Sequence, residues 1–423
     1  MAARSTNQGL ARERSEAPNN PSPGLYVHVP FCRSRCTYCD FHVASIRFPV
    51  MRDYVTALVS EITRHSALGF SPKTIFIGGG TPSALDLDSW DKLLGTLSDH
   101  FRSGLLEWTV EMNPESIDAE KIELALSHGV DRISTGAQTF DESGLSLLGR
   151  RHDAQRVFEV HQCMSELGVP RTSLDLIVGW PGQDSESVKK DLEAVSLIDP
   201  DHVSLYHLSY EQGTWLHKML TRGSIEPLLD ESCIDFSRQF LQGLSEQGYQ
   251  RYEVSNLFKR GGESLHNLNY WQRGTYLGVG SGAASFHAGE RWKNRPDVPA
   301  YISANGKPER VDVERPDGFF VVFERIMLGL RLIEGIDLAK IQAETGYDII
   351  DRCSSHLRRY EQQGFLVCDG DAIRVTAKGF EILDAIIVEL LEQLERTGDG
   401  IGIVESSGSG DSDPHLASSV MDR

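Results

Sequence analysis

The feature that most constrains the fold of this chain is a regular alternation of short apolar runs and longer amphipathic stretches across its first half. Short runs rich in β-branched residues are typical of buried strands, and apolar residues three and four positions apart are typical of helices. Strands that alternate with helices favour a parallel sheet joined by right-handed crossovers. We therefore predict an α/β fold, curved into a partial or full barrel or left open, with strands over residues 25–29, 73–77, 106–111, 132–138, 172–178 and 202–208.

Composition and charge limit what such a fold can bind. Of the 423 residues, 40% are apolar and 24% are charged, which is enough for a large core and a second module. Lys and Arg total 42 against 61 Asp and Glu, and the net charge of −19 gives no overall attraction to nucleic acid or to an anionic membrane. No apolar run reaches the roughly 18 residues of a membrane-spanning helix. We expect a soluble, cytoplasmic protein with no transmembrane segment and no nucleic-acid partner, and peripheral membrane contact stays open.

The chain divides into five parts by its residue pattern. Residues 1–24 and 397–423 are rich in small polar and charged residues, and we expect both to be disordered. The strand–helix units fill residues 25–250 and predict the barrel core, which residues 251–315 extend with short strands and Gly-rich turns. Residues 316–396 predict a small winged-helix-like module, and since it is not strongly basic we expect it to pack or bind a partner protein. Its helices are expected over 316–332, 336–344 and 348–363, and its hairpin over 365–375.

Three of the seven cysteines lie within eight residues, directly after the first predicted strand. Cys32, Cys36 and Cys39 share this loop, and the other four are scattered singly, so the pattern is not that of a disulfide framework. Thiolates are soft ligands that suit an iron–sulfur cluster or zinc, and Arg33 and Arg35 favour the ionised thiols. The sequence therefore predicts a metal or cluster site with three protein ligands and one open position.

A structural zinc ion is the alternative occupant of this loop. Such sites usually close their shell with four ligands, and His28 or His42 could supply the fourth. The chain has no second Cys pair of the kind that structural zinc sites use, which favours the cluster over zinc.

The spacing Cys-x3-Cys-x2-Cys after a first strand resembles the radical S-adenosylmethionine (SAM) superfamily. The resemblance implies that Cys32, Cys36 and Cys39 bind a 4Fe–4S cluster, whose remaining iron takes the amino and carboxylate groups of SAM. The segment Gly78-Gly79-Gly80-Thr81-Pro82 by itself could be a tight turn. It resembles the Gly-rich SAM motif of the same superfamily.

Longer segments resemble one subgroup, the coproporphyrinogen dehydrogenase-like proteins, which include the heme chaperones known as HemW. The segments are YVHVPFCRSRCTYCDF, FIGGGTPS, LGRRH, SLDLIVGWPGQ, YEVSN and HNLNYW, and the resemblance extends over residues 25–376. It implies a partial (β/α)6 barrel that binds SAM at the carboxyl ends of its strands. Taken singly, each polar residue in these segments could equally cap a strand or a helix. The implied SAM-binding residues are Tyr26, Gly79, Gly80, Thr81, Glu111, Gln138, Arg150 and Asp175.

Two sequence features separate the oxidative enzymes of this subgroup from its heme chaperones. The enzymes carry a further Cys two places after the third, where this chain has Asp40 followed by Phe41. Phe at that place and the segment HNLNYW are features of HemW-like proteins. The resemblance thus implies that His266 is an axial ligand of heme iron, with Tyr270 and Trp271 beside the macrocycle. From the residues alone, a buried core histidine is the other interpretation.

One departure from the HemW-like pattern concerns a second heme-contacting histidine. Ala284 stands where these relatives commonly have His, and His287 lies three residues further on. Either His287 takes that role, or His266 binds heme alone, or the affinity for heme is lower.

These features together predict a heme chaperone that binds a 4Fe–4S cluster, SAM and heme and transfers heme to an acceptor protein. The acceptor is not identified by the sequence, and reduction of the cluster requires an electron donor. The alternatives are a radical-SAM decarboxylase of coproporphyrinogen III and a zinc-stabilised barrel that acts through its end module. Because of Phe41 we do not expect coproporphyrinogen III oxidase activity, and we assign no catalytic residue.

Overall fold

The computed structural model describes residues 22–397 of the chain. The two terminal segments that we expect to be disordered lie outside the described residues except at their inner ends. Gly24 is the first residue of strand β1 (Gly24–Val29), and Thr397 is the last residue of helix α15 (Leu383–Thr397).

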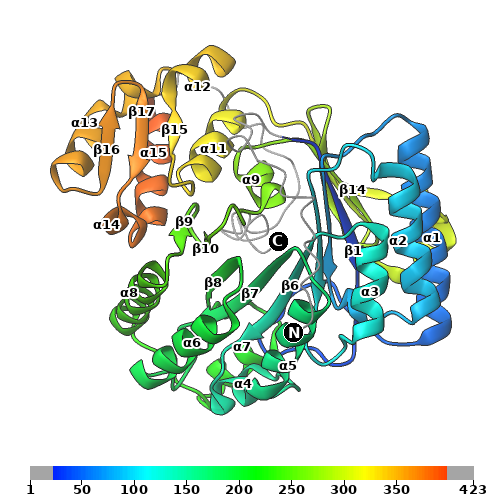
Figure 1. The fold of residues 1–423 in the computed structure, drawn as a ribbon. Coiled ribbons are helices and arrows are strands. Elements are labelled where there is room, and N and C mark those ends of the chain that lie inside the picture. The colour runs from blue at the N-terminus through cyan, green and yellow to red at the C-terminus, as the bar shows by residue number, and fades with distance from the viewer. Residues whose placement is uncertain (1–21, 398–423) are drawn as a thin grey trace, which may run out of the picture.

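The centre of the molecule is a twelve-stranded sheet in which the six predicted strands are neighbours (Figure 1). These strands pair in parallel and in chain order, and at least one helix joins each strand to the next, as the alternating pattern predicts. Each predicted range begins and ends within two residues of the observed strand. The six strands are β1, β4 (Thr74–Gly79), β5 (Glu107–Met112), β6 (Arg132–Gln138), β7 (Arg171–Val178) and β8 (His202–His207).

The sheet ends in two separate edges, so the barrel is partial. A small parallel sheet of two strands, β2 (Phe31–Cys32) and β3 (Ala44–Ser45), follows β1. Beyond β1 the large sheet continues with β11 (Tyr276–Val279), which is parallel to β1, and then with the antiparallel strands β12 (Ala284–His287), β13 (Glu290–Asn294) and β14 (Arg310–Glu314). Beyond β8 it continues with the antiparallel strands β10 (Asn256–Phe258) and β9 (Gln250–Arg251).

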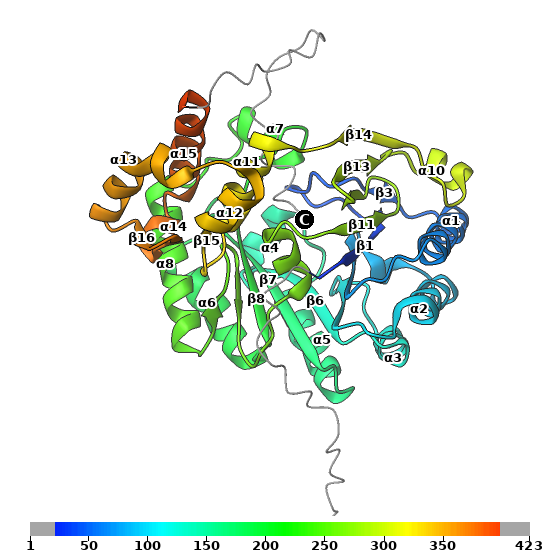
Figure 2. The ribbon, with the colours of Figure 1, turned by 90° about the horizontal axis from the view of Figure 1, so that it is seen from above.

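Helices cover the outer face of the curved sheet (Figure 2). On β8, Val203 and Leu205 pack into the apolar core beneath the helices, and the alternation of side chains along a strand points Ser204 and Tyr206 inward. The covering helices are α1 (Phe48–Ala67), α2 (Leu87–Phe101), α3 (Ala119–His128), α4 (Glu142–Leu148), α5 (Ala154–Glu166), α6 (Ser185–Ile198), α8 (Asp230–Glu246) and α10 (Val298–Ala304). Shorter helices at the strand ends are η1 (Pro82–Ala84), α7 (Trp215–Thr221) and α9 (Leu265–Trp271).

The C-terminal module has an apolar core of its own and lies beside α9 (Figure 1). Its helix, helix and hairpin follow the predicted order, with one difference. The residues expected to open the second helix instead form β15 (Ile336–Asp337), which is antiparallel to β17 (Ala372–Val375). The helix starts after them because the Asp337 side chain accepts a hydrogen bond from the backbone N–H of Lys340. The remaining elements are α11 (Gly318–Gly329), α12 (Leu338–Thr345), α13 (Ile349–Gln362), β16 (Leu366–Asp369) and α14 (Ala377–Phe380).

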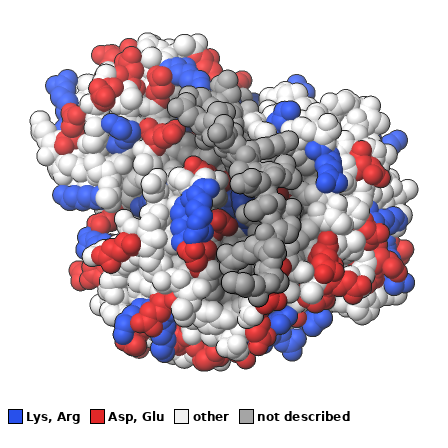
Figure 3. Space-filling view, viewed as in Figure 1, with Lys and Arg blue, Asp and Glu red and all other residues white. Residues whose placement is uncertain are grey.

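Charge is mixed on the face of the molecule seen in Figure 1. Figure 3 shows acidic and basic side chains of the described residues interspersed over this face, without a broad area of one sign. Within residues 22–397, none of the helices combines the length and the apolar character needed to cross a bilayer.

Candidate cofactor site and the histidine motif

The three cysteines lie in a loop at the carboxyl end of β1, and hydrogen bonds of Thr37 fix this loop to two helices. The backbone N–H of Thr37 donates to the carbonyl oxygen of Leu148 (3.1 Å), and its hydroxyl donates to that of Leu147 (2.8 Å). The Thr37 carbonyl oxygen accepts from the backbone N–H of Leu216 (2.7 Å). The loop therefore has its shape from protein contacts with the end of α4 and the start of α7.

Two of the three sulfur atoms are contacted by residues that the sequence predicts at the SAM site. Thr81 directs its hydroxyl to Cys32 Sγ (3.6 Å), and Arg150 directs Nη1 to Cys36 Sγ (3.4 Å). Burial raises the pKa of Cys32, and it raises the pKa of Cys39 to about 11. Without a metal these two thiols are thus protonated at neutral pH, and a bound metal would displace their protons.

The effect of the flanking arginines on the thiols is smaller than the effect of burial. Arg33 and Arg35 are both exposed, and Arg35 Nε donates to the carbonyl oxygen of Cys39 (2.8 Å). Burial, the largest influence on Cys39, outweighs the opposite effect of Arg35 and leaves the pKa of the thiol raised. Arg35 therefore favours the Cys39 thiolate as predicted, but its effect is smaller than that of burial.

The glycines at the end of β4 allow this strand to approach β1 and the cysteine loop. A Cβ atom on Gly79 would lie 2.3 Å from His28 Nδ1, and one on Gly80 would lie 2.6 Å from the backbone carbon of Pro30. Gly79 also has a φ of 107°, a conformation that favours glycine. The sequence predicts that missing side chains here admit a ligand, and the structure shows that they make room for the His28 side chain at Gly79 and for the Pro30 backbone at Gly80.

Two carboxylates lie on the inner face of the sheet near Gly79. Glu111 on β5 accepts a hydrogen bond from the backbone N–H of Gly79 (3.2 Å), and Asp175 on β7 accepts one from the hydroxyl of Ser134 (3.2 Å). Burial, followed by the negative charge of Asp175, raises the pKa of Glu111 to about 7. Burial also raises the pKa of Asp175. Two such groups on the same face of the sheet create a preference for a ligand that carries positive charge.

Arg150 and Gln138 lie in the same part of the barrel. Arg150 Nη2 donates to Asn113 Oδ1 (2.9 Å) and to the carbonyl oxygen of Gly136 (2.8 Å), and its buried Nε has no hydrogen-bond partner among the described residues. Gln138 lies at a bulge in β6 with a φ of 71°, which is unusual for a residue with a side chain. Strained backbone and an unpaired buried donor are both features that concentrate at binding sites.

Tyr26 completes the group of predicted SAM residues. Its hydroxyl is hydrogen-bonded to His28 Nδ1 (2.9 Å), and its ring stacks on Phe76 with centroids 6.4 Å apart. His28 in turn contacts Gly79. The structure thus places these residues along the strands from their middle to their carboxyl ends or in the loops beyond, and two of them, Thr81 and Arg150, contact the cysteine loop. The residues are Tyr26, Gly79, Gly80, Thr81, Glu111, Gln138, Arg150 and Asp175.

His266 is not part of this group, because it lies at the opposite end of the strands. Its ring is next to Gly24 and Thr74, the first residues of β1 and β4, whereas the cysteines follow the last residue of β1. His266 is 1% exposed, Nδ1 is hydrogen-bonded to Thr74 Oγ1 (2.8 Å), and Nε2 is hydrogen-bonded to the hydroxyl of Tyr270 (2.9 Å). Burial lowers the pKa of His266 to about 4. In this conformation the ring has the contacts of a core histidine.

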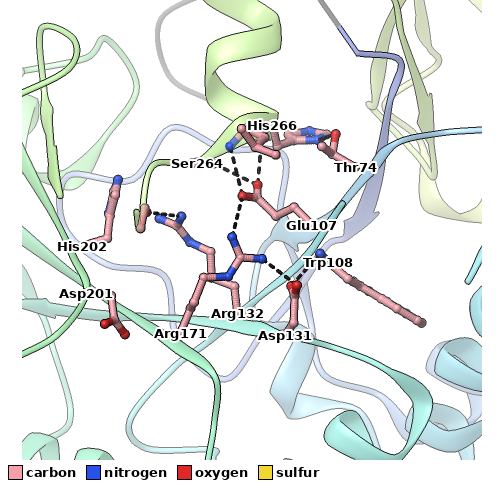
Figure 4. Close-up of polar contacts among 12 residues, drawn as sticks. Thr74, Glu107, Trp108, Asp131, Arg132, Arg171, Asp201, His202, Ser264 and His266 are labelled. Atoms are coloured by element: carbon pink, nitrogen blue, oxygen red, sulfur yellow. Dashed lines mark hydrogen bonds and ion pairs between the residues drawn. The ribbon is translucent and has the colours of Figure 1, made fainter. Parts of the chain in front are cut away.

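A buried carboxylate that the sequence reading missed holds the helix of His266 in place. Glu107 accepts hydrogen bonds from the hydroxyl of Ser264 (3.2 Å) and from the backbone N–H groups of Leu265 (3.0 Å) and His266 (3.1 Å), all at the start of α9 (Figure 4). Arg171 donates to the same carboxylate (3.3 Å). Burial alone would raise the pKa of Glu107, but Arg132 and Arg171 lower it. The carboxylate is therefore charged, and it pairs with the start of the helix and with Arg171.

One sequence signal could have found this network. Four successive strands of the sheet begin with a charged or titratable residue, at Glu107, Arg132, Arg171 and His202, each within one residue of the start of a predicted strand. In a parallel sheet the amino ends of neighbouring strands share one edge, so these side chains must meet. Figure 4 shows them gathered below α9.

His287, the alternative second heme contact, is not brought to His266. It is exposed at the end of β12, with its ring edge-on to Phe70 at a centroid distance of 5.8 Å. It lines a shallow hollow with Trp292 and Arg310. Ala284, at the start of the same strand, offers no polar group.

Comparison with known proteins decides the family. The profile described as Radical SAM superfamily matches residues 26–195, and that described as HemN C-terminal domain matches residues 321–382. A protein of Lactococcus lactis subsp. lactis (strain IL1403), named heme chaperone HemW, is 32% identical over 86% of this chain and 96% of its own length. The heme chaperone HemW of Bacillus subtilis (strain 168) is also 32% identical, over 86% of this chain and 99% of its own length. The chain belongs to the HemW family of radical SAM proteins.

A solved structure supports the same fold. Coproporphyrinogen III oxidase (HemN) from Escherichia coli, described as a radical SAM enzyme, matches with a TM-score of 0.75 over 88% of this chain and 90% of its own. The sequences are 22% identical, so this likeness shows the fold alone. The radical SAM superfamily uses a 4Fe–4S cluster and SAM. These are therefore the cofactors of the present chain, as a member of that superfamily.

The cysteine loop fits a cluster better than a single metal ion. Within the described part of the chain, no three Cys, His, Asp or Glu side chains converge as the ligands of one ion must. The cysteines of a cubane cluster bind different iron atoms and lie farther apart. His28 and His42 are also engaged elsewhere, because His28 Nε2 is hydrogen-bonded to the carbonyl oxygen of His42 (3.0 Å) and His42 Nε2 to Ser281 Oγ (3.1 Å). Three soft thiols, with no fourth ligand side chain beside them among residues 22–397, suit a cluster with one open iron.

Proposed function

We propose that this HemW-family chain is a heme chaperone, which binds a 4Fe–4S cluster at Cys32, Cys36 and Cys39, binds SAM inside the barrel and passes heme to an acceptor protein. The observation that carries the proposal is the match to curated proteins named heme chaperone HemW over 96–99% of their own length. The barrel, the extension and the C-terminal module are all included in these matches. Phe41 after the third cysteine is a second feature that the chaperones share.

The residues around the cysteine loop would have separate roles in holding the two cofactors. Thr81 and Arg150 place donors on two of the sulfur atoms, which favours the charged cluster. Glu111 and Asp175 face the interior, where they would attract the positively charged ammonium and sulfonium groups of SAM. When bound, the cluster would supply the single electron that cleaves a carbon–sulfur bond of SAM. The positions of Tyr26, Gln138 and the Gly-rich turn would enclose the remaining parts of SAM.

The proposed heme site consists of His266 and helix α9, which carries it. We propose His266 as the axial ligand of heme iron. The proposed partners of the protein are heme, an acceptor protein of unknown identity and a one-electron donor. His266 meets one requirement of a ligand, since its lowered pKa keeps the imidazole neutral at pH 7. A cytoplasmic location, with or without peripheral membrane contact, is part of the same proposal and is tested by fractionation.

Heme titration tests the carrier role. Ferric heme is added to anaerobically purified protein, and binding is followed by the change in the heme absorption spectrum. We expect His266→Ala to weaken binding and to remove the spectrum of an imidazole-ligated iron, whereas His287→Ala, at an exposed position, leaves both unchanged. Equal affinity and an identical spectrum for His266→Ala would contradict the ligand assignment. Iron and sulfide at about four each per chain would support the cluster, and about one zinc per chain would contradict it.

The second candidate function is oxidative decarboxylation of coproporphyrinogen III, which the fold shared with HemN favours. Against it, Asp40 and Phe41 follow the last cysteine of the loop. Anaerobic incubation of cluster-loaded protein with SAM, a reductant and coproporphyrinogen III separates the two functions. We expect no vinyl-bearing product, and its formation would establish the enzyme.

A further inference from the structure

The side chain of Gln138 takes its position from the backbone that carries it. Among residues 22–397, no hydrogen bond joins its amide group to another residue. A Cβ atom on Gly136 would lie 2.6 Å from Nε2 of this amide. Gly136 is on the same face of β6 as Ser134, which donates to Asp175 inside the barrel. The amide therefore lies on the inner face of the sheet, and its backbone places it there.

This backbone is strained, and hydrogen bonds hold it on its N-terminal side. Gln138 has a φ of 71°, and such a conformation persists in a residue with a side chain only where the surrounding structure holds it. The carbonyl oxygen of Gly136 accepts a hydrogen bond from Arg150 Nη2 (2.8 Å). That of Ala137 is hydrogen-bonded to His152 Nε2 (3.3 Å). Both partners come from the segment between α4 and α5, so they fix the strand before Gln138 and not the turn after it.

The turn after Gln138 is held by Asp191, a residue of α6 that has none of the roles described so far. Asp191 is 0% exposed, and its Oδ1 accepts hydrogen bonds from the hydroxyl of Thr139 (3.0 Å) and from the backbone N–H of Phe140 (2.5 Å). These are the two residues that follow Gln138 in the chain. Burying a carboxyl group costs free energy unless hydrogen bonds compensate it, and here they come from this turn. Helix α6, on the outer side of the sheet, therefore determines the course of the chain directly after Gln138.

We propose that Asp191 is a positioning residue for SAM, because it holds the turn after β6 and thereby keeps the Gln138 amide on the inner face of the barrel. This inference rests on the proposed function, in which Gln138 encloses part of SAM. Asp191 itself lies on the outer side of the sheet and acts through Gln138. Without its two hydrogen bonds the strained backbone relaxes, and the amide leaves its place beside Gly136.

Substitutions that remove these hydrogen bonds test the proposal, with SAM as the probe and anaerobic calorimetric titration as the measurement. Asp191→Ala removes both bonds, and we expect cluster-loaded protein to bind SAM about tenfold more weakly, as for the loss of two ordinary hydrogen bonds. Thr139→Val removes one of them, and we expect a loss of about threefold, which also tests the proposal if Asp191→Ala does not fold. Asp191→Asn keeps Oδ1 as the acceptor of both bonds, so its affinity should stay within about twofold of the wild type.

Two controls distinguish positioning from a loss of stability. Val195→Ala, one turn further along α6, opens a cavity in the core and keeps both hydrogen bonds of Asp191. We expect it to lower the free energy of unfolding and to bind SAM like the wild type. If it weakened SAM binding as much as Asp191→Ala, the effect would come from stability and the proposal would be wrong. The iron content of Asp191→Ala should equal that of the wild type, and a loss of iron would mean that Asp191 supports the cluster loop instead.

A double variant shows whether Asp191 acts through Gln138. We expect Gln138→Ala to weaken SAM binding, and Asp191→Ala to add no further loss when Gln138→Ala is present. If the two losses add, or if Asp191→Ala alone binds SAM like the wild type, the positioning role is wrong and the assignment of Gln138 to SAM stands. If Gln138→Ala binds SAM like the wild type, that assignment fails and the positioning role fails with it.

Discussion

Single residues with shifted pKa values determine how the SAM end of the barrel responds to pH. Burial raises the pKa of Glu111 from an ordinary value of 4.5 to about 7, and the neighbouring Asp175 adds to the shift. Between pH 4.5 and about 7, this carboxyl group is largely protonated in the folded chain and largely ionised in the unfolded chain. The contribution of Glu111 to stability therefore falls as the pH rises through this range. A cationic ligand has the opposite preference, because it binds the ionised carboxylate.

The affinity for SAM is the measurable consequence of these residue-scale shifts. We expect SAM to bind cluster-loaded protein up to about tenfold more tightly at pH 8 than at pH 6, as Glu111 ionises. Glu111→Gln should bind SAM more weakly and lose most of this pH dependence. Glu186→Gln, an exposed change on α6, serves as the control. Calorimetric titration checks this under anaerobic conditions, and a wild-type affinity that does not change with pH would contradict it.

The sequence identified site residues where they belong to a motif and missed their partners from elsewhere in the chain. Cys32, Cys36 and Cys39 are recognisable because their spacing is local. His266 is recognisable within HNLNYW, but its hydrogen-bond partner Thr74 lies 192 residues away and the carboxylate of Glu107 lies 159 residues away. No local pattern encodes such contacts, which appear only once the strand order is known.

At the scale of elements, the starts of the strands form a charged layer beneath α9. Glu107, Arg132, Arg171 and His202 are the first residues of four neighbouring parallel strands. Arg171 also pairs with Asp131 (2.6 Å), the residue before β6. A layer of this kind holds the amino ends of the strands and the start of α9 together. It explains why a short helix can keep one histidine ring in a fixed orientation.

Neutralising Glu107 should weaken this layer. Glu107→Gln removes the buried negative charge that faces Arg132 and Arg171, of which Arg171 keeps Asp131 as a partner, and we expect a loss of about 3 kcal/mol in the free energy of unfolding. In the wild type, the pKa of Glu107 is lower in the folded chain than in the unfolded chain. Its stabilising effect is therefore fully present above the ordinary pKa of a glutamate, and this effect is lost as the pH falls through the lowered pKa of the folded state. Urea denaturation measures the loss, with the exposed Glu159→Gln as control. A difference below about 0.5 kcal/mol would contradict this role.

Long elements were predictable from the sequence and very short ones were not. Strands of six to eight residues show the apolar run or alternation that a strand requires, and all six were placed within two residues. Two-residue strands such as β15 and β9 have no period to detect. Their positions follow from a partner strand elsewhere in the chain, as for Ile336, which pairs with Ile373.

At the scale of the whole molecule, the parallel direction of the strands places the cysteine loop and α9 at opposite ends of the barrel. The C-terminal module joins the α9 end, since Trp271 packs against its core and Glu324 of α11 forms ion pairs with Arg273 (2.6 Å) and Arg291. Both arginines also lie over the ring of Phe286. A change in the C-terminal module would thus affect heme binding at His266. The cluster would instead depend on the residues at the carboxyl ends of the strands.

This separation predicts that heme binding and cluster assembly are independent. The variant with Cys32→Ser, Cys36→Ser and Cys39→Ser should contain no iron–sulfur cluster and yet fold, because Thr37 holds the loop through backbone contacts. Its affinity for ferric heme should stay within about twofold of the wild type, since distant sites that share no partner act additively. Adding His266→Ala to this variant should weaken heme binding as it does in the wild type. If the serine variant alone bound heme as poorly as His266→Ala, the two ends of the barrel would be coupled and the heme site would have to lie near the cysteine loop.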